Sequence, residues 1–149
     1  MTTITLETSI KNTIDAVFNR SLDIDFHKKS ASKTQETAIA GVTTGQIGFN
    51  ETVTWRGKHF GVFLTHTSLI SAYKKPDSFT DEMIEGNFKS FKHLHTFTTS
   101  HGNTIARDEL TYEVPYGIFG WLFNVLFLKR HLTNFLLNRN LAIKNSLEH

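Results

Sequence analysis

Residues 105–128 read IARDELTYEVPYGIFGWLFNVLFL and contain the two patterns that decide the fold. The first half alternates between a mostly apolar face and a polar one, the period typical of a strand with one solvated side. After Pro115 and Gly117 the pattern becomes a long apolar run without proline that continues to Ile143, which predicts a helix. The apolar face of the strand holds Ala106, Asp108, Leu110, Tyr112 and Val114.

The predicted helix has two unlike halves. The second half is amphipathic, because apolar residues such as Leu132, Leu136 and Ile143 recur at helical intervals between polar ones. The first half is apolar all round, so it must be covered on several sides or present apolar surface to a partner. We expect two or more of four side chains to stay exposed in a monomer and to mark a homodimer contact or a ligand gate: Phe119, Phe123, Phe127 and Leu128.

Upstream of this stretch the chain has the texture of a sheet. Residues 33–114 are rich in β-branched and aromatic side chains and are punctuated by turn signals, which predicts about six strands joined mainly as hairpins. Residues 4–10 alternate and predict a first strand. Two short helices should follow it, one capped by Asn12 and one from Asp23 to Ser32. The fold class is therefore α+β, with a strongly curved seven-stranded antiparallel sheet around a long C-terminal helix.

Three stretches carry a family resemblance beyond this element order. They are RSLDIDFH at 20–27, FTDEMIEGNF followed by FKHLHTF within 79–97, and VPYGIFG at 114–120. Together they resemble the bacterial ligand-binding branch of the SRPBCC superfamily, whose helix-grip members include START domains, pollen allergens and polyketide cyclase/dehydrase-like proteins. The resemblance implies a cavity between sheet and helix that takes sterols, lipids, polyketides or other apolar molecules.

Length and composition limit the remaining possibilities. The 149 residues suit one domain, expected over 1–146, with Leu147-Glu148-His149 resembling the start of an expression tag. The absence of cysteine excludes disulfides and thiolate metal sites. A net charge of +2 without a basic stripe argues against nucleic-acid binding. No secretion signal and no run of roughly 18 apolar residues is visible, so we expect a cytoplasmic protein without an integral membrane segment.

The inward face of the sheet should supply both an apolar lining and two imidazoles. His93 and His95 lie two apart in a strand and therefore project to the same face. Around residue 52, alternation places Phe49, Glu51 and Trp55 on one face. The residues expected to contact a ligand are Phe49, Trp55, Phe91, His93, His95, Phe97, Tyr112, Trp121 and Leu122.

Two carboxylates fall on apolar strand faces and are the acid-base candidates with His93 and His95. Glu51 or Asp108 beside an imidazole would suit general acid-base catalysis, or would form a hydrogen-bonded pair that only orients the strands. A metal site would need further ligands, for which Asp81, Glu85 and Asp108 are the candidates; we expect no metal and no cofactor. His27 is expected to connect the short helices to their surroundings, with a place lining the cavity entrance as the less favoured alternative.

Three hypotheses of function follow. The first is a non-catalytic protein that binds an apolar small molecule. The second is an enzyme of the cyclase or dehydratase kind that uses an inward pair of a histidine and a carboxylate. The third is a module that meets a protein partner or a membrane surface through residues 118–128, which precede the basic group Lys129, Arg130 and His131.

Overall fold

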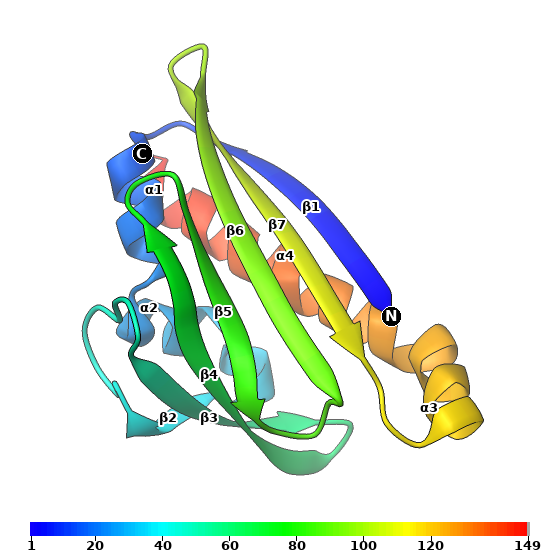
Figure 1. The fold of residues 1–149 in the computed structure, drawn as a ribbon. Coiled ribbons are helices and arrows are strands. Elements are labelled where there is room, and N and C mark those ends of the chain that lie inside the picture. Colours follow the sequence, from blue (N-terminus) through cyan, green and yellow to red (C-terminus); the bar gives the residue numbers. More distant parts are fainter. Residues whose placement is uncertain (149) are drawn as a thin grey trace.

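The computed structural model describes residues 1–148 and shows one antiparallel sheet bent around a C-terminal helix (Figure 1). The sheet order is β1-β7-β6-β5-β4-β3-β2, a meander of six strands with the first strand added beside the last. The predicted seven strands are confirmed, and so are the two short helices after β1. The strands are β1 (Thr2–Ile10), β2 (Thr37–Gly41), β3 (Thr52–His59), β4 (Val62–Lys74), β5 (Ser78–Glu85), β6 (Ser90–Ser100) and β7 (Asn103–Glu113).

The two short helices close one end of the sheet. Helix α1 spans Ile14–Ser21 and α2 spans Ile24–Ser30, with a 3-10 turn η1 at Ser32–Thr34. The predicted cap of α1 is wrong by one residue, because the Thr13 hydroxyl accepts the hydrogen bond from the Ala16 amide at 3.2 Å. Asn12 donates instead to the Leu147 carbonyl at 2.8 Å, which ties the end of β1 to the end of the C-terminal helix.

The C-terminal helix is continuous but contains one wider turn. Helix α3 (Gly117–Phe123) passes through a π-helical turn, η2 (Asn124–Leu128), into α4 (Lys129–Leu147). Within this turn the buried Asn124 accepts a hydrogen bond from the Tyr112 hydroxyl at 2.6 Å and donates one to Thr2 at 2.9 Å. The turn is therefore held to β7 and β1 by a buried polar side chain. Beyond it, α3 extends past the ends of these two strands (Figure 1).

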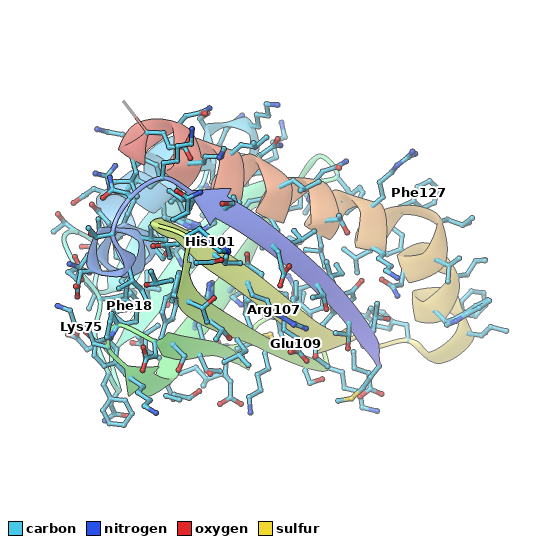
Figure 2. All side chains as sticks on the ribbon, turned by 90° about the horizontal axis from the view of Figure 1, so that it is seen from above. Phe18, Lys75, His101, Arg107, Glu109 and Phe127 are labelled. Atoms are coloured by element: carbon cyan, nitrogen blue, oxygen red, sulfur yellow. The ribbon has the colours of Figure 1, made fainter. Side chains whose placement is uncertain are left out.

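The apolar start of this helix is largely uncovered, as predicted. The exposed fractions of Phe119, Phe123 and Phe127 are 80%, 39% and 55%, whereas Leu128 is 8% exposed. Leu128 packs with Leu110 and other residues of one core cluster, and Figure 2 shows Phe127 on the side of the helix away from the strands. None of the helices in residues 1–148 is both long and apolar enough to cross a membrane.

Two clusters of buried side chains form the core, and both contribute to one cavity wall. The larger cluster surrounds Phe18 of α1, whose ring meets Phe79 and Phe97 edge-on at 5.7 and 5.6 Å. The smaller one surrounds Tyr112 and Leu110 where β7 meets the π turn and α4. Residues of both clusters, among them Phe79 and Leu110, line the cavity between the sheet and the helices.

Candidate functional site

A cavity of about 640 Å³ lies between the sheet and the helices. Its wall is formed by inward side chains of β3 to β7 together with α2, α3 and α4, and it is mostly apolar. The volume falls within the roughly 300–1,000 Å³ range of small-molecule sites. Apolar residues that line it include Val53, Trp55, Leu64, Ile70, Phe79, Phe88, Phe91, Leu110, Leu132 and Phe135.

Four of the nine side chains expected to contact a ligand line this cavity, namely Trp55, Phe91, His93 and His95. Two others are buried behind the wall: Phe97 packs against Phe18, and Tyr112 bonds to Asn124. Three lie outside it. Trp121 and Leu122 are exposed on the outer side of α3, and Phe49 is also exposed. The spacing of apolar residues along a helix or strand shows which of them share a face. It could not reveal which of these faces would line an open cavity.

The predicted inward position of Phe49 and Glu51 is wrong. Both residues precede β3, which begins only at Thr52, and both are exposed. The Glu51 carboxylate accepts a hydrogen bond from the Gly48 amide at 2.7 Å, so it closes a turn. Asn50 between them has a left-handed backbone, φ 62°, which breaks the alternation that would have carried both side chains inward.

His93 and His95 both point inward and belong to one buried network with two aspartates. His93 Nε2 donates to Asp108 Oδ1 at 2.8 Å, and His95 Nε2 donates to Asp81 Oδ2 at 2.8 Å. His95 Nδ1 lies 3.3 Å from the same oxygen of Asp108, and the two imidazole rings stack at 3.7 Å. Asn140 of α4 donates to the other oxygen of Asp108 at 2.7 Å. The network therefore links β5, β6 and β7 to the C-terminal helix.

The charges in this network compensate one another. Burial raises the pKa of Asp108, but the hydrogen bonds from His93 and His95 outweigh it and hold the pKa below its usual range. For Asp81 the same competition, with His95 as the main partner, lowers the pKa to about 2. Burial acts to lower the pKa of His95, but the hydrogen bonds to Asp108 and Asp81 outweigh it and raise this pKa overall. The pKa of His93 is lowered, because burial and the charge of His95 outweigh its bond to Asp108. His95 is thus the favoured site of positive charge.

Asp81, His93 and His95 each offer a ligand atom, and these atoms lie within 4.8 Å of one another. Both Nε2 atoms already donate to carboxylates at hydrogen-bond distance, so the imidazoles and the carboxylates are engaged with one another. Glu85, another candidate ligand, is exposed at the end of β5. The geometry fits a hydrogen-bonded network better than a metal centre, and the expected absence of a metal stays a prediction.

His27 of α2 lines the cavity, and its ring lies tilted by 41° against Trp55 of β3, with ring centroids 4.2 Å apart. Burial lowers its pKa to about 3, so the imidazole is neutral. The sequence favoured a contact around the short helices over a place at the cavity, and the structure puts His27 in the cavity wall. Its neighbour Arg139 of α4 donates to the Ser21 carbonyl at 2.9 Å and also lines the cavity.

A second polar group of the cavity was not predicted. Glu36, between η1 and β2, lines the wall near the end of β3, and its side chain is only 8% exposed. His59 Nε2 lies 3.8 Å from Glu36 Oε1, while His59 Nδ1 and His131 Nε2 share a hydrogen bond at 2.9 Å. Burial raises the pKa of Glu36 to about 7 and lowers the pKa values of His59 and His131. No sequence pattern marks this group, because its members come from three separate elements.

The cavity opens beside the exposed start of the C-terminal helix. Tyr116 and Phe119 of this region, and Phe60 in the β3–β4 turn, are exposed and still line the cavity. Across the opening the Phe60 ring meets Phe123 at 5.2 Å and His131 at 4.6 Å. The same aromatic side chains therefore form the outer surface and the rim.

Comparison with known proteins gives the same architecture. No protein-family model and no curated protein matches the chain. Among solved structures, TTHA0849 from Thermus thermophilus superposes with a TM-score of 0.76 at 17% identity, covering 97% of this chain and 99% of that one. Ginseng major latex-like protein 151 from Panax ginseng superposes with a TM-score of 0.73 at 18% identity, and the match covers 99% of this chain and 98% of that one. Ara h 8.0201 superposes with a TM-score of 0.69 at 9% identity, and the match covers 98% of this chain and 97% of that one.

At these identities the likeness shows the fold. It extends over nearly the full length of each chain, so it includes the sheet, the two short helices and the C-terminal helix together. The element order, the sheet order and these neighbours agree with the resemblance in residues 20–27, 79–97 and 114–120. The chain therefore has the helix-grip fold.

Proposed function

We propose that the chain binds an apolar small molecule in the cavity between the sheet and the C-terminal helix. The observation that carries the proposal is the volume of about 640 Å³ behind a mostly apolar, aromatic-rich wall. A domain of this size normally fills such a space with side chains, because protein interiors are close-packed. An open apolar interior with a few polar groups is the usual form of a ligand site.

Purified protein examined by native mass spectrometry, with organic extraction of any bound compound, tests this proposal. We expect a mass shift under native conditions that disappears on denaturation. In a thermal-shift screen of lipids, sterols and aromatic polyketides on the stripped protein, at least one class should raise the melting temperature, because a ligand of the native state stabilises it. No co-purifying compound and no stabilising ligand would contradict the proposal.

A second candidate function is acid-base catalysis on the bound molecule. It is favoured by the position of His93 and His95, which line the cavity and are backed by Asp81 and Asp108. A neutral His93 whose Nε2 donates to Asp108 has its Nδ1 free of a proton, as a general base requires. With the extracted ligand as substrate, His93→Ala should abolish turnover while the ligand still binds. Turnover that survives this substitution would remove the catalytic hypothesis.

A third candidate function is docking on an anionic membrane surface, from which the protein would collect its ligand. Exposed apolar side chains of residues 116–127 are followed by exposed Lys129 and Arg130, and residues 114–147 contain no acidic side chain. This combination favours anionic headgroups over a symmetric dimer, which would bring the basic residues of both copies together. Trp121→Ala should weaken sedimentation with vesicles that contain phosphatidylglycerol, and exposed Phe49→Ala serves as control. A stable dimer in solution that buries Trp121 would instead favour the homodimer.

A further inference from the structure

Glu36 is a buried carboxyl group whose hydrogen-bonding capacity is unused. Among residues 1–148, no group donates a hydrogen bond to either of its oxygens, and Oε2 is also sealed from solvent. The other acidic side chains of the cavity wall are used: Asp81 accepts from His95, and Asp23 caps α2 by accepting from the Phe26 amide. Buried charged groups are normally paired, because an unpaired one loses its hydration without compensation.

The backbone holds this carboxyl group in place. Gln35 has a left-handed backbone, φ 52°, after which Glu36 runs alongside the end of β3. A Cβ atom built on Gly57 would lie 1.8 Å from Glu36 Oε2, so the carboxyl group rests in a recess that only glycine provides. Gly57 leaves the space that the carboxyl group occupies, and no residue holds Oε2 there by a hydrogen bond.

The positive charges nearby do not neutralise Glu36. His59 is the closest titratable group, but its Nε2 is 3.8 Å away, its Nδ1 is engaged by His131, and burial lowers its pKa. Arg56 of the same strand sits over the outward Phe63 ring at 3.9 Å, on the other face of the sheet. A ligand that carries its own positive charge would therefore meet a carboxyl group that no positive charge of residues 1–148 neutralises.

We propose that Glu36 anchors a ligand whose apolar body fills the cavity and whose head is a protonated amine. This rests on the proposed ligand binding and adds the chemical class of the head group. An ammonium supplies both the positive charge and the hydrogen-bond donors that the carboxylate lacks, and such charge-assisted bonds are the stronger ones. A carboxylate head would repel Glu36, and a hydroxyl head would leave its charge uncompensated.

Three probes with the same twelve-carbon chain test the assignment: dodecylamine, dodecan-1-ol and dodecanoate. The assay measures how well each probe displaces the neutral fluorophore N-phenyl-1-naphthylamine from stripped protein at pH 8. Each probe is used below the concentration at which it forms micelles or aggregates. We expect wild type to bind the amine about tenfold more tightly than the alcohol and the carboxylate most weakly. In Glu36→Gln, which keeps the shape and removes the charge, amine and alcohol should bind alike.

Glu51→Gln is the matched control, because it removes an exposed carboxylate of the same length outside the cavity. It should keep the preference of the wild type for the amine. An alcohol that binds wild type as well as the amine, or an amine preference that persists in Glu36→Gln, would overturn the assignment while leaving apolar binding intact. If wild type takes up neither the fluorophore nor any of the three probes, the proposed ligand binding itself fails.

Discussion

The cavity contains two polar groups that differ in how completely their charges are paired. In the network of Asp81, His93, His95 and Asp108, each carboxylate accepts at least one short hydrogen bond from an imidazole. Glu36 accepts none from residues 1–148, although its side chain is nearly as buried. A paired network of this kind holds strands together, whereas an unpaired carboxyl group lowers stability and is available to a ligand. Stability measurements should therefore separate the two groups.

The largest effect is expected when the paired network is broken at Asp108. Asp108→Ala leaves His93, His95 and Asn140 without their shared acceptor, which should cost about 3–5 kcal/mol of unfolding free energy. Because the pKa of Asp108 is lowered in the fold, its stabilisation is present above the unfolded value of 3.8 and is lost as the pH falls. Denaturant unfolding at pH 7 measures the loss. A change below about 1 kcal/mol would mean that the network does not join the strands.

At Glu36 we expect that removing the charge raises the free energy of unfolding, whereas at Asp108 it lowers it. The pKa of Glu36 rises from 4.5 in the unfolded chain to about 7 in the fold, so its favourable contribution is complete below pH 4.5 and lost as the pH rises through 7. Glu36→Gln removes that pH dependence and should stabilise the protein by about 3 kcal/mol at pH 8, and by little at pH 4. Unfolding curves at both pH values compare the variant with wild type. Equal destabilisation at both would show that Glu36 is already paired.

A smaller effect is expected from filling the recess under Glu36. The new methyl group of Gly57→Ala would collide with Glu36 Oε2, which is the flexible end of a side chain and can move aside. We expect the carboxyl group to swing into solvent and its pKa to return toward 4.5; at pH 4, where the carboxyl group is protonated in wild type as well, stability should change by no more than about 1 kcal/mol. Carbon-13 NMR of the glutamate carboxyl groups follows the titration. A Glu36 pKa that stays near 7 would show that Gly57 does not position it.

The two groups also differ in what sequence reasoning could find. His93, His95 and Asp108 lie within strands of 11 residues, where alternation holds from end to end and fixes the inward face. The same reasoning failed at Phe49 and Glu51, because the turn at Asn50 interrupts the strand. Asp81 was considered only as a metal ligand, since its pairing with His95 depends on how β5 and β6 align.

Glu36, His59 and His131 could not be predicted together. They come from the η1–β2 connection, the end of β3 and α4, and only tertiary packing brings them to one place. The C-terminal helix also combines features that the sequence predicted with one that it did not. Its apolar pattern predicted its length and the exposed side chains of its first half, but the π turn depends on the buried bonds of Asn124 to Tyr112 and Thr2. Long-range pairing of single polar residues leaves no periodic signal in a sequence.

The most direct test of apolar binding in the cavity uses two neighbouring residues of β4. Leu64 lines the cavity opposite Gly57, whereas Phe63 is exposed on the other face under Arg56. Fluorescence titration of stripped protein with N-phenyl-1-naphthylamine should give saturable binding to wild type and to Phe63→Trp. In Leu64→Trp the added ring occupies the cavity and should weaken binding at least about tenfold. Equal binding by both tryptophan variants would place the probe outside the cavity and contradict the proposed function.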